Sequence, residues 1–289
     1  MKAGFAMRFA RSSLVIVTLI VLALLASPGC AKTTRPGPLD RVQPFSDKPR
    51  AGNAYLLRGF IGVFSEGVDN LGREIDRSGV RAHVYQDDQW AALARTIARE
   101  YQGKRDAEPL VLIGHSYGAD DVIRIARELD KANVPVDLLV TLDPVTPPPV
   151  PKNVREALNI YQSNGAWDAL PFLRGVPVKA DAHFVGRLDN FDIKKDRRDL
   201  LEPGTDHFNI EKKGAVHEEV VGNVLMTCPP RQTWLATRGK LPEPAVAQQR
   251  DARLARDTGS PRQPKQLRTS GERAPAAGDA QTAGHRIAN

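Results

Sequence analysis

One serine in this sequence lies in a spacing that suits nucleophilic chemistry. Ser116 is the centre of the run Gly-His-Ser-Tyr-Gly at residues 114–118, which follows an apolar stretch and precedes a helical pattern. A serine at a very sharp turn from strand to helix is pushed out above the sheet, and only small neighbours two residues away permit such a turn. To act as a nucleophile, the hydroxyl needs a base and a carboxylate that orients the base. The sequence therefore predicts a reactive serine with partners elsewhere in the chain.

The elements around Ser116 alternate between strand and helix patterns. Such alternation implies a mainly parallel sheet with right-handed crossovers. We therefore predict an α/β fold over residues 52–228, with a mainly parallel six-stranded sheet and helices on both faces. In an open parallel sheet, reactive groups gather at the carboxyl ends of the strands, and Ser116 is at such an end. The predicted strands are 54–60, 81–86, 110–114, 136–143, 155–162 and one within 183–193, and the predicted helices are 68–78, 88–102, 119–129 and 215–226.

The serine run, placed between a buried strand and an amphipathic helix, resembles the nucleophile elbow of the α/β-hydrolase superfamily. The resemblance covers about residues 52–228 and implies an acyl-enzyme on Ser116, with the Tyr117 N–H as one oxyanion donor. It also implies a minimal form of the fold. Only a Pro-rich spacer precedes the first strand, and the 144–153 connection is too short for a large cap.

In this superfamily the acid and then the histidine follow the serine along the chain. The histidines after Ser116 are His183, His207, His217 and His285. His207 occupies a loop between the last predicted strand and the last predicted helix, which is where the family carries its catalytic histidine. The resemblance therefore implies that His207 is the base. We expect His217 to pack or face water within a helix.

The candidate acid is Asp143. It ends the strand pattern Leu-Leu-Val-Thr-Leu and is followed by a proline, so its carboxylate should emerge at the same edge as Ser116. Several lipases place their acid in this way, whereas most family members use the following strand. Asp168 and Asp192 are therefore the alternatives, and Asp206 is expected to be a hydrogen-bonding residue of the loop.

The second oxyanion donor is predicted at the corner after the first strand. There, Arg58-Gly59-Phe60 resembles the His-Gly corner of many hydrolases, so the Phe60 N–H is the expected donor. The Ile61 N–H is an alternative, and Arg58 could instead be a structural ion-pair partner. Residues 164–182, with Trp167, could form a small flap or simply pack in the core.

The first thirty residues have the pattern of an export signal. Basic residues precede an uncharged run of thirteen residues, 14–26, which is short for a membrane span. The run leads to Cys30 in a context that resembles a bacterial lipobox. We therefore predict an exported, membrane-tethered protein of the cell envelope, lipidated at Cys30. The alternatives are an uncleaved anchor and a disulfide between Cys30 and Cys228, the other cysteine.

Charge is distributed unevenly along the chain. The formal net charge is +7, of which residues 1–30 carry +3 and residues 229–289 carry +6, so residues 31–228 carry −2. The predicted domain is therefore not basic, which argues against a nucleic-acid partner. Residues 31–51 read as a Pro-rich spacer, and residues 229–289 read as a disordered basic tail.

These features together indicate a serine hydrolase of carboxylic esters, similar to lipases and esterases. No metal or organic cofactor is needed for this chemistry, and no cysteine or histidine cluster suggests one. Two alternatives stay open. The same residues could transfer the acyl group to an alcohol or amine other than water, or the fold could serve as a tethered binding or scaffold protein without turnover.

Overall fold

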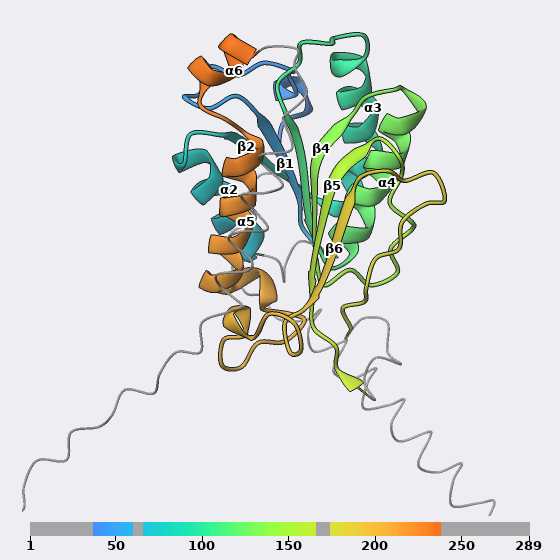
Figure 1. The fold of residues 1–289 in the computed structure, drawn as a ribbon, viewed down its shortest axis with the longest axis vertical. Helices are drawn as coiled ribbons and strands as arrows, with labels where there is room; N and C mark the ends of the chain where they lie inside the picture. Colours follow the sequence, from blue (N-terminus) through green and yellow to red (C-terminus); the bar gives the residue numbers. More distant parts are fainter. Residues whose placement is uncertain (1–36, 60–65, 166–173, 238–289) are drawn as a thin grey trace, which may run out of the picture.

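A computed structural model describes residues 37–59, 66–165 and 174–237 of the chain. Its centre is a six-stranded sheet in the order β2-β1-β3-β4-β5-β6, in which every neighbouring pair is parallel (Figure 1). The predicted α/β class and six-stranded parallel sheet are thereby confirmed. The strands are β1 (Asn53–Leu57), β2 (Arg81–Tyr85), β3 (Leu110–His115), β4 (Val136–Leu142), β5 (Val154–Tyr161) and β6 (Arg187–Asp192).

Helices cover both faces of the sheet, as predicted (Figure 1). One face packs against α3 (Trp90–Tyr101) and α4 (Tyr117–Lys131). The other packs against α2 (Glu66–Arg77) and α5 (Gly214–Thr227).

Strand β3 shows why the sheet is buried on both sides. Successive side chains of a strand point to opposite faces. Leu110 and Leu112 belong to the cluster with α3 and α4, whereas Val111 and Ile113 belong to the cluster with α2 and α5. Each of these four residues is at most 1% exposed. The continuous apolar run that predicted a doubly buried strand is explained by this alternation.

The packed part of the chain is longer than residues 52–228. Val42 lies within the predicted spacer, yet it is 3% exposed and packs in the core beside Tyr55 and Tyr101. At the other end, a short helix, α6 (Arg231–Thr237), follows within the predicted tail. Leu39–Arg41 also form a single 3-10 turn, η1. The N-terminal segment, residues 37–51, is therefore part of the fold rather than a free spacer.

The buried Glu108 carboxylate connects the two ends of the described chain. It accepts hydrogen bonds from the N–H groups of Ser46 (2.9 Å) and Gly52 (2.8 Å) and forms an ion pair with Arg231 (2.7 Å). Arg231 begins α6, and its guanidinium also donates to the Lys48 carbonyl. This network lies at the amino-terminal end of β3, opposite the end that carries Ser116.

Within residues 37–59, 66–165 and 174–237, no helix is long and apolar enough to cross a membrane. The predicted leader, with Cys30, and residues 238–289 lie outside the described residues. Cys228 is a fully buried free thiol. Burial raises the pKa of this thiol far above its usual range.

Candidate active site

Ser116 occupies a strained turn between β3 and α4. Its φ of 56° and ψ of −125° lie in a region that residues with a side chain rarely adopt. The Ser116 N–H donates to the Leu142 carbonyl over 2.9 Å, and the Ser116 carbonyl accepts the Ala119 N–H over 3.0 Å. The turn is thus held from the neighbouring strand and from the first turn of the helix.

The two glycines of the run are required by close backbone contacts. A Cβ on Gly114 would clash with the backbone of Gly118, so the strand and the helix could not approach. A Cβ on Gly118 would clash with the carbonyls of Leu57 and Arg58 at the end of β1. The spacing of two residues on either side of the serine therefore has a steric cause.

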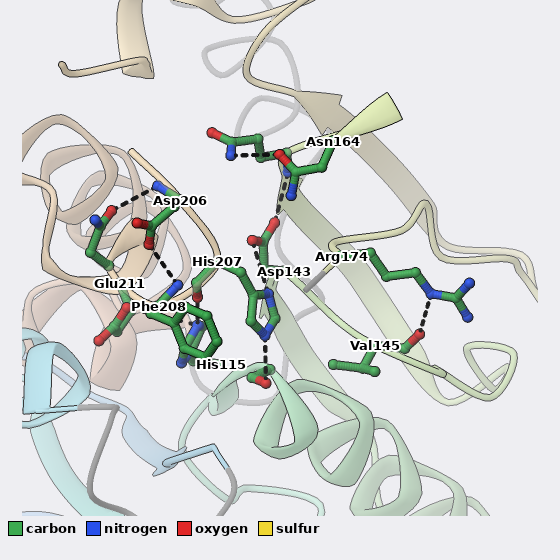
Figure 2. A network of polar contacts seen from close by, with 12 residues as sticks. His115, Asp143, Val145, Asn164, Arg174, Asp206, His207, Phe208 and Glu211 are labelled. Carbon is green, nitrogen blue, oxygen red and sulfur yellow. Dashed lines mark hydrogen bonds and ion pairs between the residues drawn. The ribbon is translucent and has the colours of Figure 1, made fainter. Parts of the chain in front are cut away.

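Ser116, His207 and Asp143 form a continuous chain of hydrogen bonds. Ser116 Oγ lies 2.9 Å from His207 Nε2, and His207 Nδ1 lies 3.2 Å from Asp143 Oδ2. Figure 2 shows the His207 ring directed at Asp143. Asp143 accepts from Nδ1–H, so Nε2 is left to accept the Ser116 hydroxyl proton. The three residues, predicted from separate segments of the chain, meet at the carboxyl end of the sheet.

Asp143 is held rigidly at the end of β4. Its backbone φ is 48°, and its N–H donates to the Ile160 carbonyl of β5 over 3.0 Å. Oδ1 accepts the Gln162 N–H over 2.7 Å, and a Cβ on Gly175 would clash with this oxygen. Burial raises the pKa of the Asp143 carboxyl above its usual range, while the hydrogen bond from His207 lowers it. The carboxylate is therefore oriented by contacts on both of its oxygens.

The loop that carries His207 is fixed by side chains on both sides. Asp206 accepts the Phe208 N–H over 2.9 Å, and the Asn209 side chain accepts the Asp206 N–H over 2.9 Å. Asp206 therefore acts as the loop hydrogen-bonding residue that the sequence suggested. Behind the loop, His115 Nε2–H donates to the His207 carbonyl over 2.9 Å.

Two buried titratable residues beside this loop were not anticipated from the sequence. Burial lowers the pKa of His115 to about 3, so its ring is neutral at neutral pH. Glu211 is 0% exposed, and its Oε2 lies 3.7 Å from His115 Nε2. Neither Glu211 oxygen has a hydrogen-bond partner among the described residues, and burial raises the pKa of this carboxyl to about 8. The only sequence signal was position: His115 lies inside the serine run, and Glu211 lies four residues after His207.

The other candidates have different surroundings. Arg58 is buried in an ion pair with Asp69, with Nε 2.9 Å from Oδ2, which matches the structural role considered for it. Asp192 bonds to Lys195 rather than to His207. His217 is buried in α5, where its Nδ1 lies 3.0 Å from Glu74.

Some predicted positions cannot be placed. Phe60 and Ile61, the candidate oxyanion donors, lie outside the described residues, as do Asp168, Trp167 and His285. Tyr117 is the first residue of α4, directly after the serine, as its predicted donor role requires. His183 is exposed at the surface. Among the residues that the structure describes, no group of three or more His, Cys, Asp or Glu could hold a metal ion.

Comparison with known proteins gives matches among solved structures alone. No protein-family model matches the chain, and no curated protein is significantly similar in sequence. A Xanthomonas campestris pv. campestris protein assigned as a hydrolase of the alpha/beta superfamily is 16% identical, covers 59% of this chain and 99% of its own, and gives a TM-score of 0.30. A metagenomic carboxyl esterase is 15% identical, covers 69% of this chain and 82% of its own, and gives a TM-score of 0.33. We base the function on the geometry of the site and not on these matches.

Proposed function

We propose that this chain is a serine hydrolase of carboxylic esters, related to the lipases and esterases of the α/β-hydrolase superfamily. The observation that carries the proposal is the hydrogen-bond chain from Ser116 Oγ through His207 to Asp143, at the carboxyl end of a parallel sheet. Ser116 and His207 are 8% and 4% exposed, so the pair is largely shielded from water while Oγ sits at a turn. An imidazole at 2.9 Å is placed to take the hydroxyl proton.

The reaction follows from these contacts. Ser116 Oγ attacks the ester carbonyl carbon as its proton passes to His207 Nε2, and the carbonyl electron pair moves to the oxygen. The tetrahedral intermediate then collapses, the bond to the alcohol oxygen breaks, and His207 returns the proton to the leaving alcohol. Water repeats the sequence on the acyl-enzyme and releases the acid. Asp143 keeps Nδ1 protonated and stabilises the imidazolium in both steps.

The oxyanion requires hydrogen-bond donors that are fixed before the reaction starts. We assign the first to the Tyr117 N–H, because Tyr117 opens α4 and the N-terminus of a helix favours negative charge. The Phe60 N–H stays the predicted second donor.

We also propose that the enzyme is exported and held at the membrane of the cell envelope. The support is the leader pattern before Cys30. Lipidation of Cys30 is the tether we favour. Mass spectrometry of the N-terminus of the membrane-extracted protein tests it, since an intact leader would show an uncleaved anchor instead.

A fluorophosphonate probe tests the hydrolase proposal on the full-length protein. The probe bonds covalently to an activated serine, so we expect labelling of wild type and none of Ser116→Ala. Ser78→Ala is the matched control, because Ser78 Oγ only donates to the Glu74 carbonyl at the end of α2, and this variant should label like wild type. No labelling of folded wild type would instead favour a scaffold role.

Labelling alone does not separate hydrolysis from acyl transfer. Turnover of p-nitrophenyl esters of increasing chain length, with and without an added alcohol or amine, distinguishes the two. We expect release of the free acid in water alone.

A further inference from the structure

A basic groove runs along one edge of the molecule, away from the triad. It has a volume of about 520 Å³ and lies between α2 and the edge strand β2. Five cationic side chains line it, against two aspartates. The cations are Arg41, Lys48, Arg73, Arg77 and Arg81.

Most of these cations have no acidic partner. Lys48 pairs with Asp76 at 2.8 Å, and the groove's other acid, Asp69, pairs with the buried Arg58. The guanidinium groups of the remaining four form no ion pair among the described residues. Arg81 donates to neutral oxygens, including the Gln43 carbonyl at 2.8 Å, and Arg73 donates to the Asn70 side chain. Arg81 uses most of its donors in such contacts. Arg41, Arg73 and Arg77 keep guanidinium donors unused among the described residues, and such donors are well suited to phosphate groups.

Positive charge is concentrated in this groove and lowers the pKa of a neighbouring histidine. Residues 31–228 carry a formal charge of −2. The groove, lined by five cations and two acids, is therefore more positive than this part of the chain as a whole. His83 of β2 also lines the groove. Burial lowers the pKa of His83, and the charges of Arg81, Arg41 and Lys48 lower it further, as a positive potential would.

The groove adjoins the place where the N-terminal chain joins the fold. The N–H of Gly37, the first described residue, donates to the Val84 carbonyl near the carboxyl end of β2 over 2.8 Å. Cys30 lies seven residues earlier. An extended chain spans at most about 3.5 Å per residue, so a tether at Cys30 would begin within about 25 Å of this point.

We propose that the α2–β2 groove binds the phosphate head groups of anionic phospholipids and orients the enzyme on its membrane. The proposal rests on the membrane tether proposed above. Strand β3, which carries Ser116 at its carboxyl end, is two strands in from the edge strand β2, a lateral separation of about 10 Å between the strands. Docking by this edge would hold the enzyme against the bilayer, where membrane-borne acyl esters are the available substrates.

Hydrogen exchange of the full-length protein on lipid vesicles tests this docking. The protein is reconstituted in vesicles of phosphatidylcholine alone, or of phosphatidylcholine and phosphatidylglycerol in equal parts. We expect amides of α2 and residues 81–85 to exchange several-fold more slowly on the anionic vesicles. High salt should remove the difference, because it screens the charges.

Paired charge reversals identify the groove as the cause. Arg73→Glu/Arg77→Glu should abolish the slowing, since each basic residue near an anionic bilayer contributes about 1 kcal/mol of binding, roughly fivefold. Arg95→Glu/Arg99→Glu is the matched control. It makes the same charge change at the same spacing on α3, across the sheet, and should retain the slowing. Arg41→Glu, in the 3-10 turn η1 rather than in α2, repeats the test if the α2 variant unfolds.

The outcomes separate the two proposals. If the wild-type protein stays with vesicles but exchanges equally fast on both compositions, the head-group site is wrong while the tether stands. If both double variants lose protection alike, general charge rather than the groove is responsible, which also overturns the proposal. If the wild-type protein does not stay with either vesicle, the tether fails.

Discussion

At the residue scale, the structure makes the roles of the triad separable. Asp143 Oδ2 orients His207, and removing its charge should leave the ring in place but in the wrong tautomer. We expect Asp143→Asn to lower kcat by about 10⁴ and His207→Ala by a similar or larger factor, with KM little changed. Ester turnover checks this, with Asp192→Asn as the matched control. If Asp143→Asn retains nearly full activity, Asp143 is not the acid.

Glu211 should make stability depend on pH. Its folded pKa of about 8 exceeds the ordinary 4.5, so the folded state holds a proton that the unfolded chain has lost. Between about pH 5 and 8 the folded state binds more protons, and the free energy of unfolding should therefore fall as pH rises. The slope can reach about 1.4 kcal/mol per pH unit.

Glu211→Gln should reduce this slope and raise the free energy of unfolding at pH 8, because the neutral amide needs no proton. Denaturant unfolding across this pH range measures it. Glu128→Gln, on the exposed face of α4, is the control and should keep the wild-type slope. A wild-type slope in Glu211→Gln would show that Glu211 is not the group responsible.

At the element scale, the contact between α4 and the end of β1 decides whether the serine turn can form. A methyl group on Gly118 would meet the carbonyls of Leu57 and Arg58, which are backbone atoms and cannot rotate away. We expect Gly118→Ala to lower the free energy of unfolding by about 1–3 kcal/mol and to slow fluorophosphonate labelling of Ser116.

The matched control is Gly214→Ala at the start of α5. Its added Cβ would lie 3.6 Å from the nearest side-chain atom, an ordinary contact. Stability should change by less than about 1 kcal/mol, since alanine is a better helix former than glycine. Equal effects of the two substitutions would mean that the close approach at Gly118 is not what limits the turn.

At the scale of the whole molecule, the Glu108 network that joins the chain ends and the catalytic triad lie at opposite ends of the sheet. Glu108 joins the N-terminal segment to α6 through Ser46, Gly52 and Arg231. Glu108→Gln leaves a partly buried guanidinium without its partner, so we expect a loss of about 3 kcal/mol in the free energy of unfolding. The rate of Ser116 labelling in the folded protein should not change.

The exposed pair Lys48–Asp76 provides the comparison. Asp76→Asn should cost at most about 1 kcal/mol, because water screens this pair. A loss in Glu108→Gln no larger than this would show that the network contributes little to holding the chain ends.

The sequence by itself determined the strands, the helices and the turn at Ser116. These depend on local spacing: the apolar run of β3 requires two covered faces, and the glycines at 114 and 118 permit a sharp turn. It also singled out Asp143, which ends a strand, and the family resemblance singled out His207, which lies in the loop before the last helix. Chain order alone could not show that their side chains meet.

Only the tertiary structure decided which side chains are neighbours. His115 meets Glu211 across 96 residues, and the α2–β2 groove gathers arginines from three separate segments. Val42 likewise packs against core residues from distant segments, and Arg231 of α6 bonds to Glu108. Local periodicity reports which face of an element is buried, but it does not report what lies against that face. Charge and proton affinity at a site are set by those neighbours.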